Sequence, residues 1–415
     1  MRARWWLATA RLLLFGAVAA AGCRSDREPV VGNAAADAGV ADAREVRADA
    51  QGAADGVVGR EGSIGDAAVE VSQVVDAGGV EAPVLDAGLL VDAGGDGVGP
   101  GDAPRVRVSA SDFVGEIAAD SFGGKATSWS RSVAGAAGIV VVANADSNSI
   151  TLLSGTPLVV QAEIAVGRDP RSVAVTPDGR YAVVVNRGDA TVSVVDLHGR
   201  TELYYFEVRP LPYGAVIANG RIYVTEWATN AVAVYAPAAR RLLARAVIGA
   251  FPAGIAHCGP PTCALPEGEG LLVTHFYSGQ VTVLDPTTLT PRQVINTGAD
   301  TNFSQQVAIA PDGRRAYLPQ TRSFADNPTR QFDTTVFPVV NVIDLASRTL
   351  LNAARITLDT ADQPVGLPFA VDFTHDGKRI VVANAASDDL SIIDLESGDK
   401  VAHVEVGAAP QGLLA

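Results

Sequence analysis

Two cysteines and the histidine beside them are the residues of this chain whose types and spacing could do local chemistry. Cys258 and Cys263 are separated by Gly-Pro-Pro-Thr, and His257 comes directly before the first of them. In an oxidising compartment a pair this close forms a disulfide that closes a small loop, and this is our prediction. Two alternatives stay open: a metal site in which His257 joins the two thiolates, and a pair of free thiols.

No other local motif predicts catalysis. The histidines are His198, His257, His275, His375 and His403. None belongs to a His-Glu-x-x-His zinc motif, and the sequence has no nucleophile elbow and no Cys-x-x-Cys-His haem attachment motif. We therefore expect no enzymatic activity, no metal and no cofactor. An active site assembled from several distant loops remains the alternative.

The stretch 171–208 shows the structural elements that would position the cysteines and histidines. It contains four short apolar runs, rich in Val and Tyr, which suit strands of a half-buried sheet. The runs are Ser172–Val175, Tyr181–Val185, Thr191–Val195 and Leu203–Val208. Turns with the sequences Pro-Asp-Gly, Asn-Arg-Gly-Asp and His-Gly-Arg separate them. The pattern predicts a four-stranded antiparallel meander of about forty residues.

The same meander recurs along the chain. Repeats begin near Arg131, Arg171, Pro212, Pro252, Gln305 and Phe369, and residues 407–415 open a seventh. An Asp closes the third strand at Asp196, Asp285, Asp344 and Asp394. Because one meander cannot bury both of its apolar faces, copies must pack on either side of it. The sequence therefore predicts an all-β fold, a β-propeller of four-stranded antiparallel blades with six repeats and the start of a seventh.

Three second-strand segments carry a family resemblance: Tyr181–Asn186, Ile222–Thr225 and Ile380–Asn384. With the Pro-Asp-Gly turn before the first of them, they resemble the YVTN repeat of surface-layer and YncE-like propellers, which are WD40-like in architecture. The resemblance covers about residues 131–415. It implies the fold but little about activity, since the repeat motif is structural and the fold hosts many functions.

The beginning of the chain predicts export. Residues 1–22 combine basic residues, an apolar run from Leu12 to Val18 and small residues, which is typical of a secretory signal peptide. The ending Ala20-Ala21-Gly22-Cys23 resembles a bacterial lipobox, with Ala20 where Leu is commonest. This resemblance implies a lipid on Cys23 and an outer-membrane lipoprotein of the cell envelope, periplasmic or surface-exposed. An ordinary signal followed by an incidental cysteine is the alternative.

The next segment differs in composition from the rest. Residues 23–104 are rich in Ala, Gly and Asp, contain no aromatic residue, and carry most of the net charge of −14. Such a segment buries too little apolar surface to fold, so we expect a disordered acidic tether. Residues 105–130 form a lead-in to the propeller of 131–415. This remainder is nearly neutral and has no basic patch, which makes nucleic acid an unexpected partner.

One insertion and the ends of the second strands predict a possible ligand face. The fifth repeat carries residues 322–338 between its second and third strands, where other repeats have a short turn. Loops at this position emerge on one face of a propeller. The candidate residues on this face are Arg322, Arg330, Asp333, Trp227, Asn186, His275, Gln320 and Asn384. The alternative is that the Asn residues only satisfy turn backbone and that the insertion only covers a channel mouth.

Together these features predict a monomeric, membrane-anchored lipoprotein whose propeller binds or scaffolds an unknown envelope protein or a small ligand. A lactonase-like hydrolase of similar fold is one alternative, and it requires convergent carboxylates or a metal at the channel mouth. A second alternative follows from Phe332–Pro338, which is similar to a stretch in larger secreted proteins that continue into a haem-binding, cytochrome c peroxidase-like domain. This chain would then be the propeller portion of such a protein.

Overall fold

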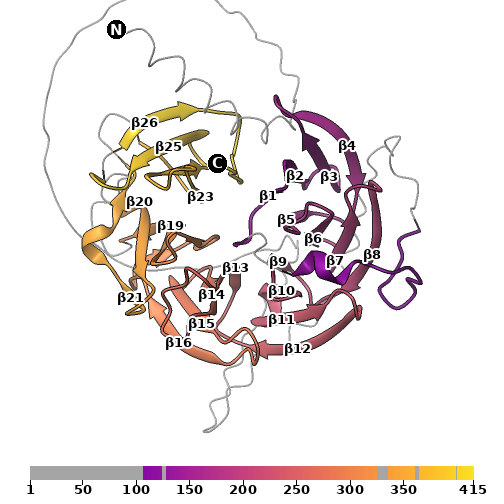
Figure 1. Ribbon diagram of the computed structural model, residues 1–415. Helices are drawn as coiled ribbons and strands as arrows, with labels where there is room; N and C mark the ends of the chain where they lie inside the picture. The colour runs from indigo at the N-terminus through magenta and orange to yellow at the C-terminus, as the bar shows by residue number, and fades with distance from the viewer. Residues whose placement is uncertain (1–105, 124–127, 325–334, 360–363, 399) are drawn as a thin grey trace, which may run out of the picture. The chain divides into compact units, whose positions relative to one another are not determined.

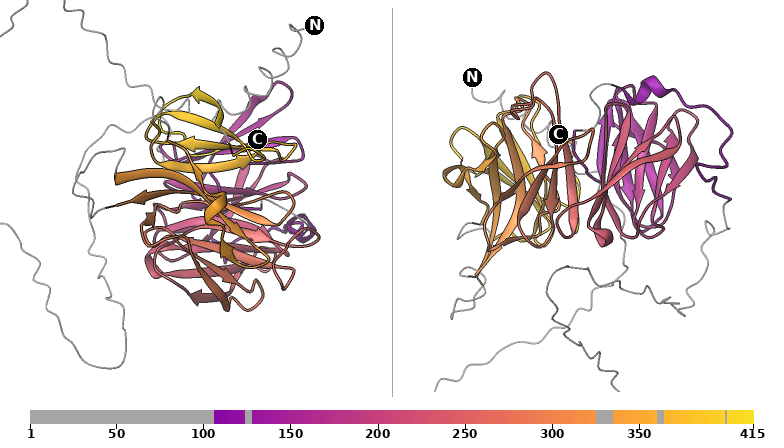
Figure 2. Two further views of the ribbon diagram at one scale, coloured as in Figure 1. Left: turned by 90° about the vertical axis from the view of Figure 1, so that its left-hand side faces the viewer. Right: turned by 90° about the horizontal axis from the view of Figure 1, so that it is seen from below.

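The computed structural model describes residues 106–123, 128–324, 335–359, 364–398 and 400–415. These residues form six antiparallel sheets arranged as the blades of a propeller ring (Figure 1). Figure 2 shows the ring from two further sides, with the strands of each blade running between its two faces. The predicted fold class is confirmed.

The blades follow one another in chain order, and in each the first strand lies innermost. Blade one contains β1 (Val133–Ala136), β2 (Ile139–Asn144), β3 (Ser149–Ser154) and β4 (Val159–Ala165). Blade two contains β5 (Pro170–Val175), β6 (Tyr181–Asn186), β7 (Thr191–Asp196) and β8 (Thr201–Glu207). Blade three contains β9 (Pro212–Ala218), β10 (Arg221–Glu226), β11 (Ala231–Ala236) and β12 (Arg241–Val247).

The second half of the ring has one irregular blade. Blade four contains β13 (Pro252–Cys258), β14 (Gly270–His275), β15 (Gln280–Leu284) and β16 (Pro291–Asn296). In blade five, β19 (Arg315–Ser323) and β20 (Val336–Asp344) are flanked by divided inner strands, β17 (Thr301–Asn302) and β18 (Ala308–Ile309), and divided outer strands, β21 (Thr349–Leu350) and β22 (Ile356–Thr357). Blade six contains β23 (Pro368–Phe373), β24 (Arg379–Asn384), β25 (Asp389–Asp394) and β26 (Lys400–Glu405). The described helical elements are the short 3-10 turns η3 (Ala119–Phe122), η4 (Trp227–Thr229) and η5 (Asn352–Ala354).

The core lies between the blades. Every residue of β6 is buried, as are the first five of β7, because both faces of these strands pack against neighbouring sheets. The outermost strand β12 is mostly exposed or half-buried instead. One core cluster combines Val141 of blade one with Val173 and Val184 of blade two. The apolar runs in the sequence are therefore explained by blade-to-blade packing, as the repeat argument requires.

Asp side chains hold the recurring turns. In the turns between first and second strands, Oδ1 of Asp178 accepts the N–H of Arg180 at 3.0 Å and Oδ1 of Asp376 accepts that of Lys378 at 3.0 Å. The glycine of this turn has a positive φ, 69° at Gly179, which explains why Gly recurs there. These local bonds stabilise the turns of the hairpins and do not depend on contacts between blades.

The segment before the first blade packs against blade two. Residues 106–123 run along blade two, where the Tyr205 N–H donates to the carbonyl of Val108 at 3.0 Å. Phe122 is fully buried, and its ring stacks on Tyr181 with centroids 5.5 Å apart. Residues 106–123, the first described part of the lead-in predicted for 105–130, therefore pack against blade two.

Residues 128–132 then cross the middle of the ring, and we call them the plug (Figure 1). The Ser130 N–H donates to the Ile255 carbonyl in blade four at 2.8 Å, and the Arg131 carbonyl accepts the Val173 N–H of blade two at 2.8 Å. One short segment thus joins blade four to blade two, which are not neighbours in the ring, and it narrows the central channel.

The residues expected to open a seventh repeat, 407–415, form no strand. Leu413 is buried in a cluster with Ala370 of blade six, and Leu414 packs on Val133 of blade one. This tail therefore lies between the last blade and the first, where Figure 1 shows the chain end. Its apolar side chains fill the junction that the repeats themselves leave between these two blades.

Candidate functional site

Loops between second and third strands, and loops between successive blades, emerge on one side of the ring, which we call the mouth face. Four predicted ligand-face residues lie in second strands, three at the last residue and Gln320 within β19, and all are fully buried: Asn186, His275, Gln320 and Asn384. Nδ2 of Asn186 donates to the hydroxyls of Thr191 and Ser193 at 3.0 and 2.7 Å. Asn384 makes the equivalent bonds to Asp389 and Ser391 at 2.6 and 3.0 Å.

The side chains of His275 and Gln320 also form hydrogen bonds inside the protein. Nε2 of His275 lies 2.7 Å from the hydroxyl of Thr282, and its Nδ1 lies 2.9 Å from the carbonyl of Ala250. Burial lowers the pKa of His275, so the ring is neutral at pH 7. Oε1 of Gln320 accepts a hydrogen bond from Asn341 at 2.6 Å. The four side chains therefore link strands within their blades and do not present polar atoms at the surface, where the sequence analysis expected a ligand face.

Glu226 occupies the equivalent place in blade three, and the sequence analysis missed it. It is fully buried and accepts two hydrogen bonds from Arg245, at 2.6 and 2.9 Å. The Arg209 N–H donates to the same carboxylate at 3.1 Å. Counting residues from Pro212 through the second strand could have identified it, because β10 ends at Glu226 and Trp227 is the first residue beyond the strand.

Trp227 lies instead within a group of five aromatic side chains, which we call the mouth cluster: Trp227, Phe251, Phe276, Tyr277 and Phe303. Its ring centroid is 4.9 Å from that of Phe251 and 6.2 Å from that of Tyr277. Phe276 lies 4.8 Å from Tyr277 and 5.4 Å from Phe303. Tyr277 is 54% exposed and Phe251 37% exposed, so the cluster reaches the surface of the mouth face.

Equivalent positions in successive repeats supply these rings. The Trp227 N–H donates to the Leu211 carbonyl at 3.1 Å, and the Phe276 N–H donates to the Phe251 carbonyl at 2.9 Å. In both blades, the residue that follows the second strand donates its N–H to the carbonyl of the residue before the proline that begins the first strand. The X-Pro step recurs in the sequence, and this signal could have placed Phe251 at the mouth beside Trp227.

Arg322, another predicted ligand-face residue, lies on the same face in blade five. Its guanidinium pairs with Asp300, with Nη2 2.6 Å from Oδ2, and it stacks over the ring of Phe324 at 5.1 Å. Asn302, the neighbour of Phe303, donates from Nδ2 to the hydroxyl of Ser323 at 2.9 Å. This charged group therefore adjoins the mouth cluster. The predicted residues Arg330 and Asp333 lie outside the described residues.

The channel between the mouth face and the plug is polar and narrow. A cavity of about 30 Å³ remains there, bordered by Ser130, Arg171, Tyr213 and Gln305 among others. The Tyr213 hydroxyl donates to Oε1 of Gln305 at 2.6 Å, and Nε of Arg171 lies 2.7 Å from Asp169. Burial, partly offset by the nearby arginines, raises the pKa of Tyr213 to about 12. This cavity has room for about one water molecule.

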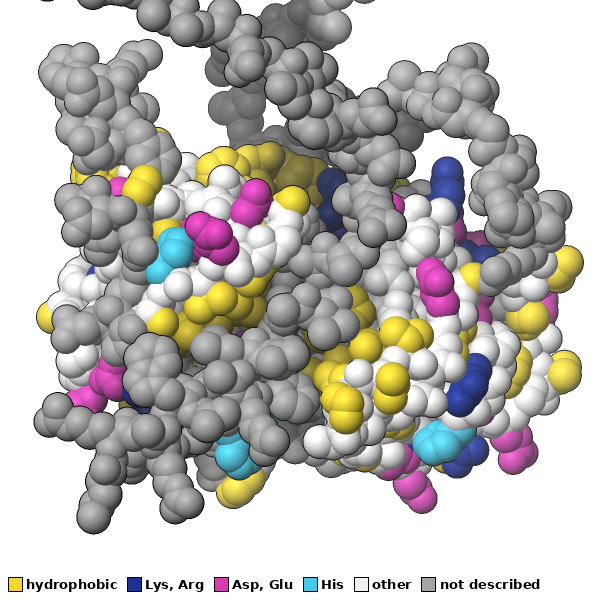
Figure 3. Space-filling model, turned by 90° about the horizontal axis from the view of Figure 1, so that it is seen from above, with side chains coloured by type: hydrophobic (Ala, Val, Ile, Leu, Met, Phe, Trp, Pro, Cys, Tyr) yellow, Lys and Arg dark blue, Asp and Glu magenta, His cyan; other side chains and the backbone are white. Residues whose placement is uncertain are grey.

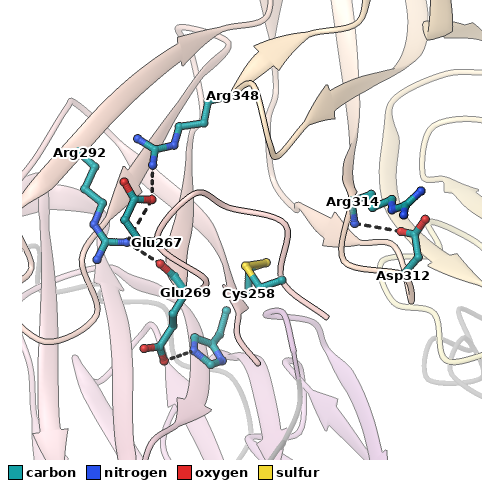
Figure 4. The surroundings of a disulfide bond; sticks show 9 residues. Cys258, Glu267, Glu269, Arg292, Asp312, Arg314 and Arg348 are labelled. Atoms are coloured by element: carbon teal, nitrogen blue, oxygen red, sulfur yellow. Dashed lines mark hydrogen bonds and ion pairs between the residues drawn. A yellow bond between two sulfur atoms is a disulfide. The ribbon is translucent and has the colours of Figure 1, made fainter. Parts of the chain in front are cut away.

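The opposite face of the ring carries the predicted cysteine pair. The structure contains the disulfide Cys258–Cys263 in the loop between β13 and β14 (Figure 4). Charged groups surround this loop: Glu267 pairs with Arg348 and lies 3.8 Å from Arg292. The hydrogen bond from Arg348 lowers the pKa of Glu267. Among the described residues the only sulfur chemistry at this loop is the disulfide, so the metal and free-thiol alternatives do not apply to this conformation.

The described residues also include no group of three or more His, Cys, Asp or Glu side chains placed to hold a metal ion. No helix in the part of the chain that the structure describes has the length and apolar character to cross a membrane. The predicted lipidation site Cys23 lies outside the described residues.

Figure 3 views the rim near β4 and β26, where basic and acidic side chains are interspersed with apolar ones.

Comparison with known proteins supports the class of protein that this geometry defines, a six-bladed β-propeller. No protein-family model matches the chain, and no curated protein matches it. Among solved structures it is similar to a hydrazine synthase chain of Kuenenia stuttgartiensis, with 19% identity and a TM-score of 0.59 over 66% of this chain and 87% of that chain.

Two further structures are similar at the level of fold. One is a functionally unknown protein from Desulfotomaculum acetoxidans, with 16% identity and a TM-score of 0.54, covering 69% of this chain and 88% of that one. The other is a Bacteroides uniformis protein named provisionally as a 6-phosphogluconolactonase, with 18% identity, a TM-score of 0.50, and coverage of 65% and 82%. At these identities the similarities show the fold and carry no activity over to this chain.

Proposed function

We propose that the chain is an envelope lipoprotein whose YVTN-type propeller binds another protein of the cell envelope through the mouth cluster. The observation that carries this proposal is the exposure of Tyr277 and Phe251 at the edge of five contiguous aromatic rings. Exposed large apolar groups cost solvation free energy unless a partner covers them, and contiguous patches of this kind mark interaction sites.

The composition of the cluster fits a protein partner. Trp and Tyr are the residues that most often supply the binding energy at the centre of protein interfaces, because they bury a large area at low entropic cost. The Arg322–Asp300 pair beside the cluster is half-buried and would lie at the polar rim. The cluster is an open patch and the adjoining channel is nearly filled, so the geometry favours a broad partner over a small ligand at this face.

Export and lipidation of Cys23 provide the location in this proposal. A lipid on Cys23 followed by the acidic segment 24–104 would tether the propeller to a membrane. The test compares the full chain with its Cys23→Ser variant in a bacterial host. We expect the unmodified chain in the membrane fraction with the mass of a lipid-modified cysteine, and the variant in the soluble fraction. Equal partition of both would contradict the anchor while leaving the mouth cluster untouched.

The interaction itself is tested with matched surface variants. Tyr277→Ser with Phe251→Ser removes the exposed rings, whereas Val159→Ser with Val160→Ser removes the comparably exposed apolar residues of β4. In a titration of immobilised full chain with solubilised envelope proteins of the source cell, loss of two hot-spot rings should weaken saturable binding at least about tenfold. The β4 variant should bind like the unmodified chain. Equal binding by all three would contradict the proposal.

A further inference from the structure

The turn between β9 and β10 contains the only Asn-Gly dipeptide of the sequence, Asn219-Gly220. In such a dipeptide the backbone nitrogen of the glycine can lose its proton and bond to Cγ of the asparagine, because glycine has no side chain that hinders the approach. The side-chain amide takes up a proton and leaves as ammonia, and a five-membered succinimide ring remains. Water then opens the ring at one carbonyl to aspartate or at the other to isoaspartate. Asn219 is exposed, so solvent reaches it.

The fold holds this dipeptide in a conformation that opposes the reaction. The φ angles of Asn219 and Gly220 are 51° and 70°, as in the two-residue hairpin turns in which both residues have a positive φ. Ala218 pairs with Arg221 in the flanking strands, and this register fixes the turn from both sides. Ring closure requires Cγ of Asn219 and the nitrogen of Gly220 to rotate towards each other, which the paired strands resist.

The lead-in segment 106–123 adds a second restraint. The Gly220 N–H donates to the carbonyl of Phe122 at 3.2 Å. The attacking nitrogen must lose this proton, and a hydrogen bond donated by the N–H favours the protonated form. Phe122 is itself held in place, since its ring is fully buried and stacks on Tyr181. Reaction at Asn219 therefore depends on whether this end of the segment is docked on the ring.

The side chain of Asn219 is bonded to blade four. Its Nδ2 donates to Oε1 of Glu269 at 2.5 Å, and Nε2 of His257 lies 2.9 Å from the same oxygen. Burial opposes the charge on Glu269, but the hydrogen bonds from Asn219 and His257 outweigh it and lower the pKa of this carboxyl. A carboxylate at position 219 would replace a donor by a second negative charge. Deamidation would therefore break a contact between blades three and four.

The corresponding turns of other blades show why an amide matters here. Three of them contain Asp-Gly, and Oδ1 of each Asp accepts the backbone N–H two residues further along: Asp178 at 3.0 Å, Asp312 at 2.9 Å and Asp376 at 3.0 Å. Those carboxylates have a donor within their own turn. The partner of Asn219 is itself a carboxylate, Glu269, so an aspartate at this position meets like charge.

We propose that Asn219 is a deamidation site that the docked segment 106–123 keeps unreactive, and that undocking of this segment converts Asn219 to aspartate and isoaspartate. The reaction consumes water, releases ammonia and needs no enzyme. The product loses the hydrogen bond to Glu269, which weakens the contact between blades three and four. The inference does not depend on the proposed partner, because turns between first and second strands lie on the face opposite to the mouth cluster.

The test follows the conversion of Asn219 in the full chain at neutral pH. Mass spectrometry of the peptide that contains residue 219 measures deamidation, and enzymatic methylation of isoaspartate identifies the product. Phe122→Ala removes the buried ring that fixes the segment, so we expect Asn219 to react at least about tenfold faster than in the unmodified chain. The control Tyr223→Phe removes a hydrogen bond to the Pro286 carbonyl from the same blade and should react as the unmodified chain does.

Two further samples separate local undocking from general unfolding. The chain unfolded in urea should react fastest, and Phe122→Leu, which keeps most of the buried volume, should react faster than the unmodified chain and more slowly than Phe122→Ala. Equal rates in the unmodified and unfolded chains would overturn the proposal, as would a Tyr223→Phe variant that reacts as fast as Phe122→Ala. Where circular dichroism shows that Phe122→Ala does not fold, Phe122→Leu takes its place, and a rate equal to that of the unmodified chain would overturn the proposal.

The effect of the product is measured with Asn219→Asp. We expect a lower urea midpoint than for Asn219→Ser, the matched neutral variant. Glu269→Gln should cost less stability in the Asn219→Asp background than in the unmodified chain, because it removes the like charge. An Asn219→Asp midpoint equal to or above that of Asn219→Ser would overturn the proposed effect on the contact between blades.

Discussion

The ion pair between the plug and blade six allows a quantitative test of how the ring is held together. Arg131 and Asp372 have side chains only 10% and 7% exposed. Replacement by Arg131→Met leaves the Asp372 carboxylate with two backbone donors, the N–H groups of Phe373 at 2.8 Å and Ala415 at 3.1 Å. Removing one partner of a buried pair costs about 3–5 kcal/mol, which is a large part of a typical unfolding free energy.

The pH dependence of this cost has a defined sign. Burial, opposed by Arg131, already raises the pKa of Asp372, and loss of Arg131 raises it further. In the variant the folded state then binds a proton more tightly than the unfolded state does. Its stability should therefore rise as pH falls through the folded pKa towards the unfolded value of about 3.9. The penalty of Arg131→Met should be smaller at pH 4.5 than at pH 7.

The assay is urea unfolding of the full chain, followed by circular dichroism at both pH values. The control is the double variant Arg131→Met with Asp372→Asn, which removes both charges and keeps an acceptor for the Phe373 N–H. We expect it to lie within about 1 kcal/mol of the unmodified chain. A loss below about 1 kcal/mol for Arg131→Met at pH 7, or the same loss at both pH values, would refute the argument that this buried pair stabilises the ring.

Three further predictions concern the repeated blade structure. The hydrogen bond from the Thr288 N–H, together with Arg292, lowers the pKa of Asp285 to about 2. Because the pKa of Asp285 is lower in the folded than in the unfolded chain, the charged carboxylate stabilises the fold above about pH 4. In acid titrations the unmodified chain should therefore lose stability relative to Asp285→Asn as pH falls from about 4 towards 2. Replacing both Cys258 and Cys263 by Ser should lower the unfolding free energy by about 2 kcal/mol, because the closed loop is short; no change in urea midpoint would contradict this. The fully buried Tyr204 donates to the Pro237 carbonyl at 2.8 Å, so Tyr204→Phe should cost about 1–2 kcal/mol in the same assay, and a neutral effect would show that this carbonyl finds another donor.

The repeats made most of the fold predictable. Val- and Tyr-rich runs such as Tyr181–Val185, separated by Asp-Gly turns, identify strands because turn chemistry and strand period are local properties. The sequence also placed an Asp at the end of the third strand, and β7, β20 and β25 do end at Asp196, Asp344 and Asp394. Asp196 accepts the N–H groups of His198 and Gly199 in the following turn at 3.0 Å. The divided strands of blade five were not predictable, because no local signal marks where a strand loses its partner.

The candidate functional site was harder to predict from the sequence than the fold. The strand ends Asn186 and Asn384 carry polar side chains, but whether these turn outward or across the blade depends on partners such as Ser193 and Ser391, seven residues further along. The aromatic residues of the mouth cluster come from three blades, and only the ring geometry brings them together. The same holds for the contact between the plug and blade six, because it joins segments as distant as Trp129 and Phe373.

The most direct test of the proposed function is site-specific photo-crosslinking in the native envelope. A photoreactive phenylalanine analogue replaces Tyr277 in the mouth cluster or, as the control, Val159 on β4, which is 56% exposed. We predict one defined crosslinked species from position 277, lost when Phe251→Ser is added, and none from position 159. Equal crosslinking at the two positions, or no species from position 277, would contradict the assignment of the mouth cluster as the surface through which this propeller binds its partner.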